Sequence, residues 1–160
     1  MDAQPYTRSA DVSRRPHVLI ISDDTGLSGF LNDGLVVAGC WVSVVASGLQ
    51  VLEVFRLRSF ELAVVDVALG GLGASELIRR LGVIDHTGVS RSDIPLIVIA
   101  ESEREIQAAG VDTATVGGVI VAPFEIEDLA LTIYATVREW RLEHPDRPWS
   151  DEAAQARPDG

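Results

Sequence analysis

The segment HVLIISDD, residues 17–24, decides the fold of this chain. It is an apolar, branched run that ends in one serine and two aspartates. Four further apolar runs follow it, each too short and too uniformly apolar to be a half-exposed strand. We therefore predict five strands that are buried on both faces. They cover residues 17–22, 41–46, 62–67, 95–100 and 118–122.

The segments between these strands show the helical spacing of apolar residues. Strands that alternate with helices form a parallel sheet, because right-handed crossovers place helices on both of its faces. The sequence thus predicts a doubly wound five-stranded α/β fold. Residues 86–93 have the composition of an exposed loop before the fourth strand. The expected apolar faces are Leu27, Phe30, Leu31 and Leu35 in the first helix, and Leu49, Leu52, Val54 and Phe55 in the second.

The last predicted helix has the clearest apolar stripe, and it follows an acidic opening that suits the helix dipole. The chain then turns polar and rich in proline, which indicates a loose tail. We expect residues 1–15 and 142–160 to be flexible tails around one domain, residues 16–141. Leu131 and Tyr134 lie off the stripe and are available to a partner, including a second copy in a homodimer. The stripe consists of Ile126, Leu129, Ala130, Ile133, Val137 and Trp140.

Size and charge restrict what this chain can do. Its 160 residues, 47% of them hydrophobic, suffice for one well-buried core. Acidic residues number 24 against 13 basic ones, a net charge of -11, which argues against binding to nucleic acid or to anionic membranes. All basic residues are arginine, so Schiff-base chemistry and lysine-dependent phosphate loops are excluded. The expected partners are proteins or cations.

The sequence shows no signal for export or membrane insertion. Residues 1–15 lack the apolar stretch of a secretory signal, and no segment approaches about 18 uncharged apolar residues. The one cysteine, Cys40, lies in an apolar run, where cysteine is more often a small core residue than a nucleophile. A cytoplasmic protein is the expectation.

Acidic side chains follow two of the predicted strands. Asp23 and Asp24 come directly after the first, and Asp66 ends the third. Ligands bind beyond the carboxyl ends of parallel strands, so these carboxylates converge if the two strands are neighbours. Two like charges about 4 Å apart repel by roughly 1 kcal/mol in water and roughly 4 kcal/mol at a partly buried site. A proton or a divalent cation offsets such repulsion, and oxygen ligands favour Mg²⁺ over zinc.

Plainer interpretations remain open for these residues. Asp23 and Asp24 are also suited to cap the helix that begins near Thr25. An aspartate at the end of an apolar strand, as at Asp66, is harder to explain by local structure alone. The glycine-rich residues 70–73 resemble a phosphate-binding loop only superficially, and we interpret them as a tight turn.

The order of these motifs resembles the receiver domain of bacterial response regulators, over roughly residues 16–141. The resemblance implies a flavodoxin-like or CheY-like sheet with the strand order 2-1-3-4-5. The segments that are similar to the family are SDD at residues 22–24, AVVDV at residues 63–67, the run at residues 95–100 and VAPF at residues 121–124.

The resemblance also implies roles for individual residues. Asp66 corresponds to the aspartate that accepts a phosphoryl group from a histidine kinase or a phosphotransfer protein. Asp24 corresponds to a direct Mg²⁺ ligand, Asp23 to a mainly water-mediated one, and the backbone carbonyl of Ala68 to a further one. An aspartate that attacks phosphorus in line, beside a metal ion that neutralises the transferring oxygens, agrees with these residue types.

Three positions depart from the family's pattern. Ala100 stands where the family has threonine or serine, Ala122 where it has lysine, and Val119 where an aromatic residue commonly couples the pocket to the outer face. Alanine can neither donate a hydrogen bond to a phosphoryl oxygen nor neutralise it. Arg104 or Ser102 is available to compensate. The peptide bond after Ala122 precedes a proline and is a candidate for cis geometry.

The sequence therefore supports two main functions. The first is a stand-alone, atypical receiver domain in a two-component or phosphorelay pathway, which binds Mg²⁺ weakly, accepts phosphate on Asp66 and acts on a downstream protein. The second is a phosphorylation-independent interaction module on the same fold. A small hydrolase with Asp66 as nucleophile is a weaker third hypothesis, because no lysine is present to assist it.

Overall fold

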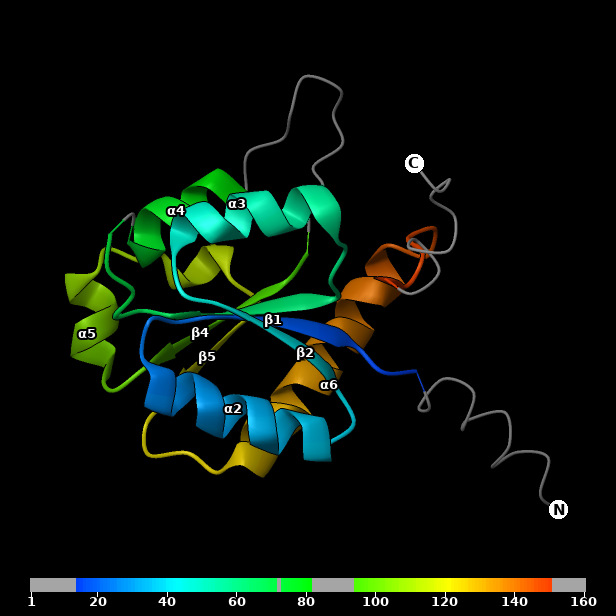
Figure 1. Ribbon diagram of the computed structural model, residues 1–160, viewed down its shortest axis with the longest axis horizontal. Coiled ribbons are helices and arrows are strands. Elements are labelled where there is room, and N and C mark those ends of the chain that lie inside the picture. Colours follow the sequence, from blue (N-terminus) through cyan, green and yellow to red (C-terminus); the bar gives the residue numbers. More distant parts are fainter. Residues whose placement is uncertain (1–13, 72, 82–93, 151–160) are drawn as a thin grey trace, which may run out of the picture.

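The computed structural model of the chain describes residues 14–71, 73–81 and 94–150 (Figure 1). The predicted loop at residues 86–93 lies outside this part, as do residues 1–13 and 151–160 of the two predicted tails. Among the described residues, no helix has the length and apolar character needed to cross a membrane.

Five parallel strands form one sheet in the order β2-β1-β3-β4-β5. Each strand falls within one of the predicted apolar runs, and branched residues suit a pleated surface. Burial on both faces is confirmed for β1, β3 and β4 only. The outer strands β2 and β5 are partly covered, and Trp41 and Val44 of β2 are 55% and 44% exposed. The predicted fold class and strand order are confirmed. The strands are β1 (His17–Ile21), β2 (Trp41–Val45), β3 (Leu62–Asp66), β4 (Leu96–Ala100) and β5 (Gly118–Val121).

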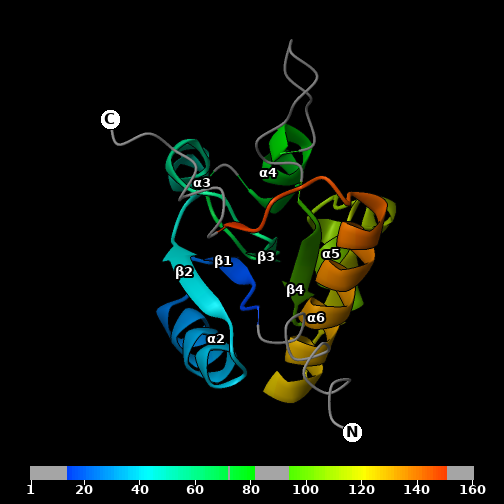
Figure 2. The same cartoon turned by 90° about the vertical axis from the view of Figure 1, so that its right-hand side faces the viewer.

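Helices cover both faces of the sheet (Figures 1 and 2). Those on one face are α2 (Thr25–Val37) and α6 (Ile126–Glu143), and those on the other are α3 (Gly48–Leu57), α4 (Ala74–Leu81) and α5 (Glu103–Ala108). A short 3-10 helix, η1 (Thr113–Thr115), precedes β5. Side chains alternate along each strand. Val18 and Ile20 therefore join the core under α2 and α6, whereas Leu19 and Ile21 join the core on the opposite face.

The predicted apolar helix faces are only partly correct. Phe30 and Leu49, both expected in the core, are 51% and 68% exposed. The buried side chains of α3 are Phe55, which belongs to the predicted face, and Val51, which does not. They lie four residues apart and so on one side of the helix. Six of the ten residues in α3 are large and apolar, so the sequence pattern does not define a single face. Contact with the sheet selects the face that is buried.

The chain after α6 packs against the domain. Residues 144–150, here called the C-terminal strap, bring Trp149 against the core on the α2 and α6 face. The guanidinium carbons of Arg14 and Arg141 lie 5.3 and 4.0 Å from the centroid of the Trp149 ring. The structure thus departs from the loose tail predicted for residues 142–150, because one large aromatic ring with cationic neighbours anchors a segment of otherwise polar composition.

The strap ends at a buried carboxylate. Glu61 is 5% exposed and accepts hydrogen bonds from the backbone nitrogen of Ser150 (2.8 Å), the hydroxyl of Ser150 (2.8 Å) and the backbone nitrogen of His17 (2.7 Å). Burial raises the pKa of Glu61 above its ordinary value of 4.5, while these hydrogen bonds and the charge of Arg141 oppose the shift. These contacts hold the end of the strap beside His17, the first residue of β1.

Ionisation of Glu61 should make the strap site sensitive to pH. Because the folded pKa is raised, the stabilisation from protonated Glu61 is complete below the ordinary value of 4.5 and is lost as pH rises through the folded pKa. Glu61→Gln cannot ionise and should lack this loss. Denaturant titrations of both proteins from about pH 4 to about pH 8 should show the wild type losing free energy of unfolding relative to the variant as pH rises. Parallel pH profiles would contradict this account.

Close packing of α2 against α6 makes Gly34 sensitive to substitution. A Cβ atom added at Gly34 would overlap the side chain of Ile126, whereas one added at Gly29, on the same helix, would meet no atom within 4 Å. Gly34→Ala should lower the free energy of unfolding by about 1 kcal/mol or more, because overpacking outweighs the gain of about 1 kcal/mol in helix propensity. Gly29→Ala is the control and should be neutral or stabilising. Adding Ile126→Ala should recover part of the Gly34→Ala loss, and thermal melts of the four proteins test the set.

Candidate functional site

The acidic residues gather where β1 and β3 end. These strands are neighbours, with Ile20 paired to Val64 and Ile21 paired to Val65. Parallel strands bring their carboxyl ends to one edge of the sheet, so the loop after Ile21 lies beside the end of β3. The adjacency on which the predicted pocket depends is present.

Asp66 is a buried acid that faces the first loop. It is 7% exposed, and its Oδ2 accepts a hydrogen bond of 2.7 Å from the hydroxyl of Ser22. Its Oδ1 accepts a hydrogen bond of 2.9 Å from the backbone nitrogen of Ala68. Both oxygens are therefore engaged by the protein, which satisfies a carboxylate that the fold removes from water.

Asp24 is the N-cap residue of α2. Its Oδ1 accepts a hydrogen bond of 3.0 Å from the backbone nitrogen of Leu27, and its backbone is extended as a cap requires. The capping role that the sequence left open is thus present at Asp24. The carboxylate that was expected to be the direct metal ligand holds the start of a helix in this structure.

Asp23 connects the first loop to the glycine-rich turn. Its Oδ2 accepts a hydrogen bond of 3.1 Å from the backbone nitrogen of Gly70, 47 residues away. A Cβ atom at Gly70 would lie 3.2 Å from this oxygen, so glycine permits the close approach. Gly71 and Gly73 have positive φ values of 69° and 83°, which supports the predicted tight turn.

The three carboxylates do not form a ready-made metal cage. Within residues 14–71, 73–81 and 94–150, no group of three histidine, cysteine, aspartate or glutamate side chains is arranged to hold an ion. The donor chemistry still suits Mg²⁺, since carboxylate and carbonyl oxygens are the ligands that it prefers. A cation at this edge therefore has to compete with hydrogen bonds that each aspartate already makes.

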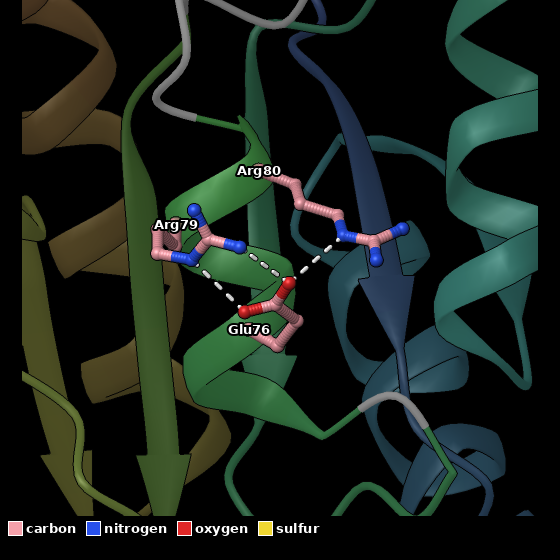
Figure 3. Close-up of polar contacts among 3 residues, drawn as sticks. All are labelled: Glu76, Arg79 and Arg80. Atoms are coloured by element: carbon pink, nitrogen blue, oxygen red, sulfur yellow. Dashed lines mark hydrogen bonds and ion pairs between the residues drawn. The ribbon is translucent and has the colours of Figure 1, made fainter.

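The basic side chains nearest in sequence to the glycine-rich turn are already paired. Glu76 accepts hydrogen bonds from Arg79, at 2.9 Å from Nε and 2.6 Å from Nη2, and from Nε of Arg80 at 3.1 Å (Figure 3). The hydrogen bonds from Arg79 and Arg80 lower the pKa of Glu76 to about 2. Glu76 thus joins two arginines of α4 in one ion-pair cluster on the surface.

The positions that depart from the family supply no hydrogen-bonding side chain. Ala100 is 2% exposed, and Val119 is partly buried against the core on the α3, α4 and α5 face. Ser102 caps α5 by accepting from the backbone nitrogen of Glu105 at 3.1 Å, and Arg104 is exposed on that helix. The peptide bond between Ala122 and proline is cis, as the sequence suggested.

Other predicted residues have structural roles. The hydroxyl of Tyr134 donates to the carbonyl of Ala38 at 2.8 Å, so it ties α6 to the end of α2, whereas Leu131 is 69% exposed. Cys40 is buried in the core, and burial raises the pKa of its thiol, which fits the structural role predicted for it. Nε2 of His17 lies 2.8 Å from the hydroxyl of Ser43.

Sequence reasoning missed Ser22. The sequence pattern gives Ser22 no role beyond its place in the SDD motif, but in the structure its hydroxyl contacts Asp66 directly. The available signal was a hydroxyl at the end of an otherwise apolar strand, one position before the acidic pair. A buried hydroxyl there needs a partner, and the neighbouring strand supplies one.

Curated relatives of this chain are named as regulatory proteins or response regulators. It is 29% identical over 124 residues to "Uncharacterized transcriptional regulatory protein YkoG" of Bacillus subtilis, which covers 77% of this chain and 51% of that protein. It is 29% identical to "Regulatory protein VirG" of Rhizobium rhizogenes (77% and 48% covered) and 27% identical to "Response regulator ArlR" of Staphylococcus haemolyticus (76% and 52% covered). The chain spans about half the length of these relatives. No family model matches it.

Solved structures share its fold. The signal receiver domain of an HD domain-containing protein from Pseudomonas fluorescens aligns with a TM-score of 0.69 at 15% identity, covering 84% of this chain and 95% of that one. The chemotaxis response regulator CheY4 of Vibrio cholerae aligns with a TM-score of 0.57 at 19% identity, covering 79% and 98%. The chain therefore has the CheY-like fold of these solved structures, with the strand order 2-1-3-4-5. Its relatives in sequence are named as regulatory proteins and response regulators.

Proposed function

We propose that this receiver domain is a component of two-component or phosphorelay signalling, with Asp66 as its phosphoacceptor and protein binding as its output. The supporting observation is the placement of Asp66, a buried carboxylate at the end of β3 that faces the loop carrying Asp23 and Asp24. The domain then acts through the state of one aspartate and not through turnover of a metabolite.

The chemistry needed at Asp66 is limited. One carboxylate oxygen attacks the phosphorus of a phosphohistidine on a histidine kinase or phosphotransfer protein, and the histidine leaves with the electron pair. Asp23, Asp24, Asp66 and the carbonyl of Ala68 are the oxygens that would hold Mg²⁺. When bound, this ion would neutralise charge on the transferring oxygens. Weak binding is expected, because the aspartates have to exchange existing hydrogen bonds for the ion.

The same structure supports a candidate surface for the partner. Leu131 is 69% exposed and Leu142 is 74% exposed, both on α6. We propose that this helix meets a downstream protein or a second copy of the chain. The net charge of -11 disfavours nucleic acid and anionic membranes as direct partners.

A second candidate is an interaction module that does not depend on phosphorylation. It is favoured by the alanines at positions 100 and 122, which cannot donate to a phosphoryl oxygen, and by the hydrogen bonds that already satisfy Asp66. In this case Asp23 and Asp66 only hold the loops in place, and the surface of α6 binds its partner whether or not the protein is phosphorylated.

Mass spectrometry separates the two candidates at the chemical step. The protein is treated with acetyl phosphate and Mg²⁺, and intact mass is followed over time. A single phosphoryl adduct is expected in the wild type, and none in Asp66→Asn, because the amide cannot act as the nucleophile. No adduct in the wild type would favour the phosphorylation-independent module, and an adduct that persists in Asp66→Asn would exclude Asp66 as the labelled residue.

A second test concerns the cation alone. Mg²⁺ at about ten times its dissociation constant should raise the free energy of unfolding by about 1.4 kcal/mol, measured from thermal melts. Asp24→Asn should remove this effect yet retain the helix cap, because asparagine caps as well as aspartate but lacks the charge. Asp24→Ala should remove both the effect and the cap. Equal Mg²⁺ stabilisation in wild type and Asp24→Asn would exclude Asp24 as a ligand.

A further inference from the structure

The hydroxyl of Ser22 is a buried polar group in direct contact with the proposed phosphoacceptor. Ser22 is 2% exposed. Its Oγ donates to Oδ2 of Asp66 at 2.7 Å and accepts from the backbone nitrogen of Asp24 at 3.1 Å. Among the described residues, it is the side chain that hydrogen-bonds Asp66, since the other donor is the backbone nitrogen of Ala68. One hydroxyl therefore bridges the acceptor and the acidic turn.

Strand pairing fixes this contact. The pairs Ile20–Val64 and Ile21–Val65 place Ser22, the first residue after β1, beside Asp66 at the end of β3. Side chains alternate across a sheet, so residues at the same level of adjacent parallel strands point to the same face. The register of two central strands therefore sets the position of this hydrogen bond.

We propose that Ser22 is a positioning residue that restrains phosphoryl transfer at Asp66. Its hydroxyl slows formation of the aspartyl phosphate and accelerates hydrolysis of that group. This inference rests on the proposed function of Asp66 as phosphoacceptor. It goes beyond that function by giving the domain a built-in preference for the unphosphorylated state.

The effect on formation follows from the charge of the carboxylate. As an oxygen of Asp66 bonds to phosphorus, the bond from phosphorus to the leaving group breaks, and the leaving group takes the electron pair. Negative charge on the Asp66 carboxylate falls during this step. The hydrogen bond from Ser22 is strongest to the full carboxylate, so it stabilises the reactant more than the transition state. The barrier to phosphorylation is thereby raised.

The effect on hydrolysis has the opposite sign. A water oxygen bonds to phosphorus, the bond from phosphorus to Asp66 breaks, the electron pair returns to the carboxylate, and a proton of the water passes to solvent. Negative charge on Asp66 now rises, and the hydrogen bond from Ser22 strengthens as it does. Ser22 therefore shortens the lifetime of the phosphorylated state.

Ser22→Ala tests the inference by intact-mass kinetics with acetyl phosphate and Mg²⁺. Labelling should be about three- to tenfold faster, and decay after removal of the donor should be slower by a similar factor, as expected for loss of one charge-assisted hydrogen bond. Ser22→Thr retains a hydroxyl and should return both rates toward those of the wild type. Ser28→Ala is the matched control, because Ser28 is also buried and its hydroxyl donates to the carbonyl of Asp24 at 2.8 Å without contacting Asp66.

The outcomes are distinct. Labelling of Ser22→Ala at or below the wild-type rate, or a shorter lifetime of its adduct, would overturn the proposal, as would equal changes in Ser28→Ala. If neither the wild type nor any variant is labelled, the proposed acceptor role fails, and the restraint that rests on it fails as well. Labelling of the wild type with unchanged rates in Ser22→Ala would overturn the restraint alone and leave the acceptor role of Asp66 standing.

Discussion

Parallel pairing of β1 with β3 is the constraint on which the rest of this structure depends. It sets Ser22 beside Asp66 and brings the first acidic loop to the glycine-rich turn, where Asp23 reaches Gly70. Because the two strands lie at the centre of the sheet and are buried on both faces, their register cannot slip without exposing two hydrophobic cores. The register of these strands therefore fixes where Ser22 and Asp66 lie relative to each other.

Two buried acids lie at opposite ends of the central strand β3, and each holds a different part of the chain in place. Asp66, where β3 ends, holds the first loop through Ser22, and Glu61, just before β3 begins, holds the C-terminal strap through Ser150. In the described part of the chain, every buried side-chain nitrogen or oxygen has a hydrogen-bond partner. These hydrogen bonds offset the free-energy cost of removing the two carboxylates from water. They also hold the first loop and the strap in fixed positions against the sheet.

The site proposed for phosphoryl transfer combines a buried aspartate, Asp66, with small apolar residues at two nearby positions. The relatives named above are 27–29% identical to this chain over 122–125 aligned residues. Here small apolar residues occupy positions 100 and 122, while a hydroxyl contacts Asp66 from the side of β1. If Asp66 accepts a phosphoryl group as proposed, the alanines would stabilise that group less than polar residues would, and the Ser22 hydrogen bond would stabilise the free carboxylate. Both features would then favour the unphosphorylated state.

The sequence alone determined the five strands, their parallel arrangement and the positions of the acidic residues, because short apolar runs and alternating periodicity are local properties. Tertiary structure decided which face of α3 is buried, that Trp149 anchors the strap, and how each aspartate is used. Asp24 caps a helix and Asp66 accepts from Ser22 because the partners lie at particular distances and angles. Such contacts join atoms across strands or turns, and hydrogen bonds depend on geometry that residue order does not specify.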